Sequence, residues 1–257
     1  GAKLNIFIDM EAHEHGGGHP VLTTVRLESG KERPEIIYVP YAFFHFPQRK
    51  CCKPEDVVKA KAVDDATRKE IVESKLKFAA FAGRICEGSD GDILQTKLFD
   101  KLSDEYERVD ALAGCRHNAE PVSEIPEIFN NDHDRNIAWF EPYKFAIVFE
   151  SSSKRGYLTQ KLMDAVLANA IPIYWGPPDV TDLVNMDAIV YCEPGGDESF
   201  KACIEEIRSL DRDDKKYFEK LSQPLFKDNV PPDWMQWEPL VESILSLYID
   251  RVFHRNQ

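Results

Sequence analysis

The chain has 257 residues, of which 43% are hydrophobic and 30% charged, a composition typical of a folded globular protein. Its formal net charge of −13 argues against nucleic acid or an anionic membrane surface as the main partner. No apolar run approaches the roughly 18 residues that a membrane-spanning helix needs. The length allows one large domain or two small ones.

Cysteine spacing fits neither a metal motif nor the framework of a small secreted domain. Several of these residues lie in apolar runs, which indicates buried thiols and a reducing compartment. We therefore expect a cytoplasmic protein, with the Golgi lumen as the alternative if a membrane anchor accompanies the chain. The six cysteines are Cys51, Cys52, Cys86, Cys115, Cys192 and Cys203.

The N-terminal stretch Leu4–Met10 is typical of a strand, and it is followed by acidic and histidine residues and the glycines Gly16–Gly18. Carboxylates and imidazoles after a strand suit acid–base chemistry, although most charged loop residues are merely solvated. Imidazoles can also bind zinc, but their spacing here matches no helix-borne zinc motif. The three imidazoles are His13, His15 and His19.

The middle of the chain alternates helical and strand patterns. Residues 48–74 are charged and helical in character, and we interpret them as a connection between domains. A strand at Lys77–Ala82 is followed by an amphipathic helix at Leu94–Tyr106 and a short strand at Val109–Ala113. A polar, proline-containing loop then leads toward Ile137–Phe140.

A strand–loop–helix–strand unit occupies residues 145–178. Phe145–Phe149 is an unbroken apolar run, which is typical of a strand buried on both faces. From Leu158 on, apolar residues recur at four-residue spacing, which predicts a helix. Ile171–Trp175 is again typical of a strand and ends at Gly176. Such units place ligands at the carboxyl ends of their strands.

The loop and helix start of this unit are cationic, since Lys154, Arg155 and Lys161 gather there. We expect Thr159 to cap the helix. Free backbone N–H groups and the positive helix end would favour a bound anion. A solvated basic loop is the alternative.

Strands and helices continue to alternate toward the C-terminus, with a strand predicted at Ala188–Cys192 and helices at Phe200–Leu210 and Asp211–Leu221. Met235–Val252 is amphipathic and is predicted to pack back across a domain junction. This alternation predicts an α/β fold with a mainly parallel sheet.

The 145–178 unit resembles the donor-binding signature of glycosyltransferase family 10, the α-1,3/α-1,4-fucosyltransferases. The chain departs from that pattern at Ser151, where the family has Asn, and at Gln160, where it has Glu. It departs again at Gln95, where the family has a phosphate-binding arginine, and Arg84 or Arg155 could supply this charge. The matching positions are Tyr143, Lys144, Phe145, Phe149, Glu150, Ser152, Gly156, Tyr157, Thr159, Lys161 and Ile171–Gly176.

The resemblance implies a GT-B arrangement of two Rossmann-like domains with mainly parallel sheets, the first one short. Residues 1–76 would form a reduced acceptor-side domain and the connection. Residues 77–257 would form the domain that binds the nucleotide sugar.

The implied reaction is metal-independent, inverting transfer of L-fucose from GDP-fucose to a hydroxyl of a glycan or glycoconjugate, with no cofactor beyond that co-substrate. Glu11 aligns with the family's general base, and His13, Glu14 and His15 would lie on the acceptor side. The implied residues for binding the nucleotide sugar are Lys161, Tyr157, Gln160, Ser151, Ser152, Glu150, Arg155, Arg84 and Gln95.

Two alternatives follow from the three departures. The same fold could use another nucleotide sugar, for example a UDP-sugar. A catalytically weak module could instead recognise a glycan or a nucleotide without turnover. Without the resemblance, ordinary packing of Tyr157 and loop capping by Ser151 are the simpler interpretations.

Overall fold

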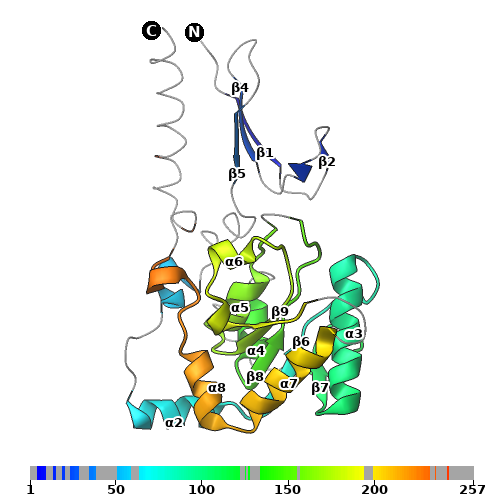
Figure 1. Ribbon diagram of the computed structural model, residues 1–257, viewed down its shortest axis with the longest axis vertical. Helices are drawn as coiled ribbons and strands as arrows, with labels where there is room; N and C mark the ends of the chain where they lie inside the picture. The colour runs from blue at the N-terminus through cyan, green and yellow to red at the C-terminus, as the bar shows by residue number, and fades with distance from the viewer. Residues whose placement is uncertain are drawn as a thin grey trace.

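The computed structural model of the chain is drawn in Figure 1. Glu11, His13, Arg155 and most of the predicted C-terminal helix lie outside the residues it describes. The described residues are the five N-terminal strands, residues 51–58, 64–121, 134–154, 157–193 and 199–231, and residues 125, 127, 235 and 242.

A parallel sheet of five strands forms the centre of the larger part of the chain, in the order β10-β9-β8-β6-β7. Numbered along the chain from β6, this is the doubly wound order 2-1-3-4-5, which reverses direction between β6 and β8. The predicted α/β class is confirmed. The strands are β6 (Lys77–Phe81), β7 (Val109–Ala111), β8 (Tyr143–Ile147), β9 (Ile171–Tyr174) and β10 (Val190–Tyr191).

The apolar run around β8 is buried on both faces of the sheet. Phe145, Ile147 and Phe149 pack into one hydrophobic cluster, whereas Ala146 and Val148 pack into a second one. This alternation follows from the two-residue period of side chains along a strand. It explains why the strand is apolar at every position rather than at every second one.

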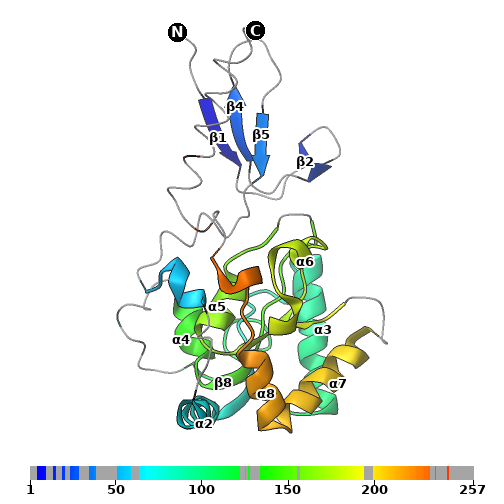
Figure 2. The ribbon, with the colours of Figure 1, turned by 60° about the vertical axis from the view of Figure 1, so that its left-hand side comes forward.

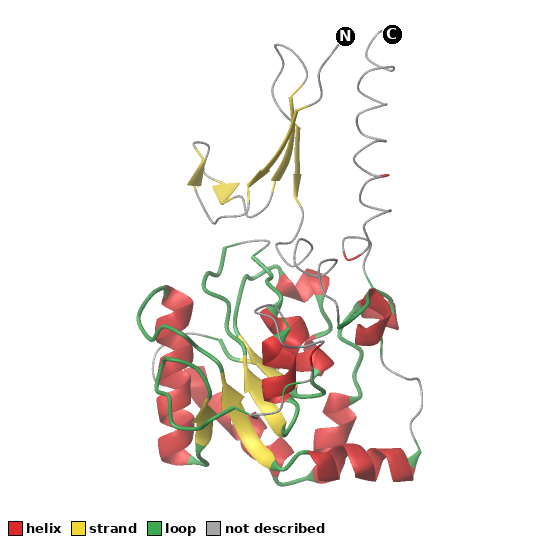
Figure 3. Cartoon of the chain, turned by 180° about the vertical axis from the view of Figure 1, so that it is seen from behind, coloured by secondary structure: helices red, strands yellow, loops and turns green. Residues whose placement is uncertain are grey.

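Helices cover both faces of this sheet (Figures 1 and 3). The cluster with Phe145 contains buried residues of α3 (Asp90–Glu105), α7 (Ser199–Asp211) and α8 (Asp214–Leu221). The opposite cluster contains residues of α4 (Arg135–Phe140) and α5 (Lys161–Leu167). None of the helices in the described part of the chain has the length and apolar composition that crossing a bilayer requires.

The remaining helices of this part of the chain include α2 and α6, which Figure 2 labels. They are α2 (Asp65–Ser74), α6 (Val180–Leu183) and the 3-10 helices η1 (Pro54–Val57), η3 (Met186–Ala188) and η4 (Lys227–Asn229).

Two helix starts differ from the sequence prediction. Helix α3 begins at Asp90, one turn before the predicted start, because the Ser89 hydroxyl caps it by accepting a bond from Asp92 N at 3.2 Å. Helix α5 has Gln160 rather than Thr159 as its N-cap residue. The Thr159 hydroxyl accepts only a 3.3 Å bond from Lys161 N.

The N-terminal strands pair antiparallel, which differs from the parallel sheet expected for the first domain. They form a three-stranded sheet, β1-β4-β5, and a separate hairpin of β2 and β3. The connection from β4 to β5 covers only residues 29–34, too short for the crossover that parallel neighbours need. The strands are β1 (Asn5–Asp9), β2 (Glu14–His15), β3 (His19–Pro20), β4 (Thr24–Glu28) and β5 (Glu35–Tyr38).

The six cysteines form three disulfides, so the expectation of buried free thiols is wrong. The spacing could not indicate this because each pair is closed by the fold or by direct adjacency rather than by a recognisable motif. Disulfides persist in oxidising compartments, which weakens the argument for a cytoplasmic location. The pairs are Cys51–Cys52, Cys86–Cys115 and Cys192–Cys203.

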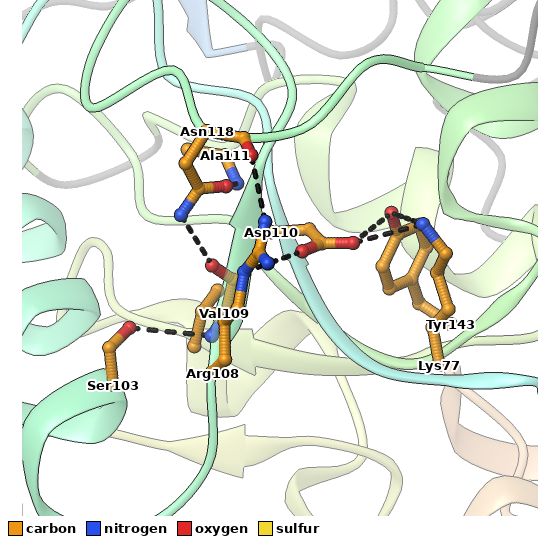
Figure 4. A network of polar contacts seen from close by, with 8 residues as sticks. All are labelled: Lys77, Ser103, Arg108, Val109, Asp110, Ala111, Asn118 and Tyr143. Atoms are coloured by element: carbon orange, nitrogen blue, oxygen red, sulfur yellow. Dashed lines mark hydrogen bonds and ion pairs between the residues drawn. The ribbon is translucent and has the colours of Figure 1, made fainter.

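The edge strand β7 is protected by a loop residue, as Figure 4 shows. The Asn118 side chain accepts from Ala111 N at 2.8 Å and donates to Val109 O at 3.1 Å. It therefore satisfies backbone groups that an edge strand would otherwise present to another chain.

Asp110 of β7 joins three strands through one carboxylate (Figure 4). Its Oδ2 accepts from Lys77 Nζ at 3.0 Å and from the Tyr143 hydroxyl at 2.9 Å. Arg108 Nε lies 3.4 Å from Oδ1. The bond to Asp110 raises the pKa of Lys77, which reflects stabilisation of its charged form.

We predict that Asp110→Ala lowers the free energy of unfolding by about 1–3 kcal/mol, because it leaves the hydroxyl of the buried Tyr143 without its acceptor. Urea denaturation measures the change. Glu73→Ala is the control, since its 3.6 Å pair with Lys69 is solvent-exposed and should contribute less than about 1 kcal/mol. Equal stability of the two variants would contradict the role of Asp110.

Candidate functional site

A cavity of about 410 Å³ opens at the carboxyl ends of β6 and β8, where the strand order reverses. This is the position at which doubly wound sheets bind ligands. Its lining residues come from the loop after β6, the starts of α3 and α5, helix α4 and the end of β8. They are Ala82, Gly83, Arg84, Ile85, Asp92, Gln95, Arg135, Asn136, Trp139, Phe140, Ile147, Val148, Ser151, Gln160 and Lys161.

Gly91 brings helix α3 against the end of β8. A Cβ atom at this position would overlap the Glu150 carbonyl, which is backbone and has little freedom to move. Gly91 N also points to Ser151 O, at 3.4 Å. The close contact explains how Asp92 and Gln95 of α3 reach the same cavity as Ser151.

Glu150 is fully buried and fixes the approach to α5. Its carboxylate accepts bonds from Thr159 N and from the Thr159 hydroxyl, both at 2.7 Å, and from the Tyr174 hydroxyl at 3.3 Å. Burial raises the pKa of Glu150, while the Lys161 charge and these hydrogen bonds oppose the shift. The side chain thus positions residues 159–161 from beneath the cavity.

Lys161 and Gln160 turn from this anchored segment toward the cavity. Lys161 Nζ donates to Phe149 O at 2.8 Å, and an ammonium group has two further N–H bonds to offer. Gln160 Oε1 is buried and has no hydrogen-bond partner among the residues that the structure describes. A buried unsatisfied oxygen on a cavity surface is suited to accept a bond from a bound molecule.

Positive charge predominates among the residues that line the cavity. Arg84, Arg135 and Lys161 are cationic, and Asp92 is the acidic side chain of the lining set. Such a balance suits a ligand that carries two or more negative charges, although the chain as a whole is acidic.

Gln95 does not take the place of the arginine that the resemblance leads one to expect. It is buried, and its Nε2 donates to Asp92 Oδ1 at 3.0 Å. Asp92 Oδ2 also accepts from the Ser89 hydroxyl at 2.7 Å. The start of α3 therefore presents a hydrogen-bonded carboxylate and amide rather than a cation.

Five of the predicted nucleotide-sugar residues line the cavity together: Arg84, Gln95, Ser151, Gln160 and Lys161. Three others do not line it. Glu150 lies buried below the cavity. The Ser152 hydroxyl accepts from Lys154 N at 3.2 Å, and Tyr157 N donates to Lys154 O at 3.1 Å. Arg155, Glu11 and His13 lie outside the described residues, and of Glu14 and His15 the structure gives only the backbone pairing in β2.

Sequence reasoning missed one side of the cavity entirely. Helix α4 contributes Arg135, Asn136, Trp139 and Phe140, which we call the α4 wall. The available signal was the four-residue spacing of Arg135 and Trp139, which places them on one helix face. Because the helix has only six residues, this spacing alone could not distinguish a helix from a loop.

The comparison with protein families decides the identity of this part of the chain. Residues 72–222 match the family described as glycosyltransferase family 10 (fucosyltransferase), C-terminal part. The chain belongs to glycosyltransferase family 10. The match includes every strand of the parallel sheet and every residue that lines the cavity.

Relatives within the family share only part of their length with this chain. The GDP-fucose protein O-fucosyltransferase 3 of Xenopus laevis is 27% identical over 159 residues, covering 59% of this chain and 31% of that protein. The alpha-(1,3)-fucosyltransferase FucT of Helicobacter pylori is 34% identical over 79 residues, which is 31% of this chain and 16% of that protein. The chain thus spans a third or less of the curated relatives it matches.

Solved structures support the fold. A crystal structure of an alpha1,3-fucosyltransferase with GDP-fucose superposes with a TM-score of 0.54 at 19% identity, covering 81% of this chain and 64% of that one. A second alpha1,3-fucosyltransferase structure gives 0.53 at 23% identity, covering 70% of this chain and 49% of that one. The expected GT-B-like fold class is confirmed.

We predict that Glu150→Ala lowers the free energy of unfolding by about 3 kcal/mol or more, since it leaves buried donors of Thr159 and Tyr174 without an acceptor. Chemical denaturation measures the loss. Glu141→Ala, an exposed position, is the control and should change stability little. A loss no larger than that of the control would contradict the anchoring role.

The pH dependence of Glu150→Gln tests the same site. Because the pKa of Glu150 is raised above its ordinary 4.5, the unfolded chain releases this proton at lower pH than the folded one. The stability of the unmodified chain relative to Glu150→Gln should therefore fall as the pH rises above 4.5. If the stability of the unmodified chain relative to Glu150→Gln increases with pH instead, the raised pKa of Glu150 is contradicted.

Proposed function

We propose that the chain binds GDP-fucose in the cavity between β6 and β8 and transfers L-fucose to a hydroxyl group with inversion. The single observation that carries the proposal is that three positions of the family signature, the matching Lys161 and the substituted Ser151 and Gln160, line one cationic cavity where the strand order of the sheet reverses. Family membership and the GDP-fucose named in relatives' titles support this donor.

The diphosphate is the leaving group in this proposal. As the bond between the anomeric carbon and the phosphate oxygen breaks, the electron pair stays on GDP. Lys161 would stabilise this developing charge, because a fixed cation costs no reorganisation at the moment of reaction. Glu150 would act indirectly, by holding residues 159–161 in place.

Glu11 is the proposed general base. It would take the proton of the acceptor hydroxyl while that oxygen attacks the anomeric carbon from the face opposite the leaving diphosphate. Attack from that face inverts the configuration. His13, Glu14 and His15 are proposed to lie beside the acceptor, and residues 1–76 are proposed as its domain, with residues 77–257 as the domain of the nucleotide sugar.

The acceptor is proposed to be a hydroxyl of a glycan or of a polypeptide. The first choice follows from the family resemblance, and the second from the name of the Xenopus laevis relative, a protein O-fucosyltransferase. The three disulfides support a location in an oxidising lumen of the secretory pathway rather than in the cytoplasm.

A different nucleotide sugar is the second candidate. It is favoured by Gln95, whose amide is bonded to Asp92 where a family member would carry an arginine. Calorimetry with GDP and with UDP separates the two, and turnover with a panel of sugar nucleotides separates a transferase from a binding module. UDP binding without GDP binding would overturn the GDP-fucose assignment.

We predict that Lys161→Met weakens GDP binding by about tenfold or more, because it removes a charge-assisted bond to the diphosphate. Titration calorimetry measures the dissociation constant. Lys97→Met on the exposed face of α3 removes the same charge away from the cavity and should leave binding unchanged. Unchanged affinity in Lys161→Met would overturn its role.

We predict that Glu11→Gln lowers kcat for fucosyl transfer by about a hundredfold or more and leaves the affinity for GDP unchanged, since only proton removal is lost. Transfer assays with glycan and peptide acceptors measure kcat. Glu107→Gln, at an exposed position, serves as the control. Full activity in Glu11→Gln would remove Glu11 as the base.

A further inference from the structure

The side of the cavity formed by α3 lacks a cation for a diphosphate. Gln95 is neutral and engaged with Asp92, and the Asp92 carboxylate itself lines the cavity. A carboxylate near phosphate oxygens raises the free energy of the bound state. The charge that binds a diphosphate must therefore come from another side of the cavity.

The α4 wall offers hydrogen-bond donors of the required kind. Arg135 is half-buried, and its guanidinium carbon lies 5.8 Å from the centre of the Trp139 ring. Trp139 Nε1 is buried and donates to no acceptor within the described part of the chain. An indole N–H and a guanidinium group only donate hydrogen bonds, and phosphate oxygens only accept them.

The α4 wall is also fixed relative to Lys161. Asn136 Nδ2 donates to Asp164 Oδ2 of α5 at 3.3 Å, and Ile137, Phe140 and Leu162 share one hydrophobic cluster. Arg135 and Lys161 therefore line the same cavity from two helices that pack together. Arg84, by contrast, is exposed in a loop.

We propose that Arg135, which lies over the Trp139 ring, binds the diphosphate together with Lys161 and replaces the charge that Gln95 lacks. The inference rests on the proposed nucleotide-sugar site and names the side chain that binds its phosphates. The planar guanidinium group can donate two parallel hydrogen bonds to two phosphate oxygens, a fixed fork geometry that a lysine ammonium lacks. The Trp139 indole N–H contributes a neutral bond beside it.

Calorimetry with GDP, guanosine and inorganic pyrophosphate tests the proposal. Arg135→Met should weaken GDP and pyrophosphate binding by about tenfold to a hundredfold and leave guanosine binding unchanged. Arg135→Lys should lose less than Arg135→Met, and Lys97→Met should lose nothing. A merely structural role for Arg135 would weaken all three ligands together.

A second-site variant makes the test sharper. Adding Gln95→Arg to Arg135→Met should restore GDP affinity, because it returns a cation to the α3 side of the cavity. If Arg135→Met does not fold, Trp139→Phe provides the readout, since it keeps the ring and removes the N–H. It should weaken pyrophosphate binding severalfold and spare guanosine.

The outcomes separate this inference from the proposed function. If the unmodified chain binds UDP and pyrophosphate but not GDP, the GDP-fucose assignment is overturned. In that case a tenfold to hundredfold loss of UDP affinity in Arg135→Met would still support the role of Arg135. Normal GDP and pyrophosphate affinity in Arg135→Met, or an equal loss for guanosine, would overturn the role of Arg135. Binding of none of these ligands by the unmodified chain would overturn both.

Discussion

A buried carboxylate connects the parts of the sheet on which the candidate site depends. Glu150 lies just after β8. Its carboxylate accepts two hydrogen bonds from Thr159, which precedes α5, and one from Tyr174 of β9. A buried charged or protonated carboxyl group is costly unless its hydrogen bonds are satisfied, so this arrangement strongly specifies one path for residues 150–161. The direction in which Gln160 and Lys161 face the cavity follows from that path.

Close approach of α3 is the second constraint on the site. Gly91 lets the first turn of the helix touch the Glu150 carbonyl, and the Cys86–Cys115 disulfide joins the loops that follow β6 and β7. Thr96 of α3 contacts both loops, through the Cys86 carbonyl at 3.2 Å and Cys115 Sγ at 3.5 Å. The loop that contains Arg84 and Ile85 is therefore fixed by the disulfide to the loop after β7 and by the Thr96 contact from α3.

Much of this organisation could be predicted from local sequence, because the strands of a parallel sheet are continuous apolar runs. Phe145–Phe149 and Ile171–Trp175 overlap β8 and β9 for this reason. The start of α3 was missed because Asp90, Gly91 and Asp92 carry no apolar periodicity. The disulfides and the α4 wall depend on contacts between distant segments, which periodicity does not encode. The antiparallel N-terminal sheet departed from an expectation based on resemblance alone.

The central claim is that the cavity between β6 and β8 binds the diphosphate of a nucleotide sugar. A crystal structure of the chain with GDP tests it most directly. We predict electron density for the phosphates between the loop after β6 that contains Arg84, the α4 wall and Lys161, where the strand order reverses. Nucleotide bound elsewhere on the molecule, with this cavity filled only by solvent, would contradict the account.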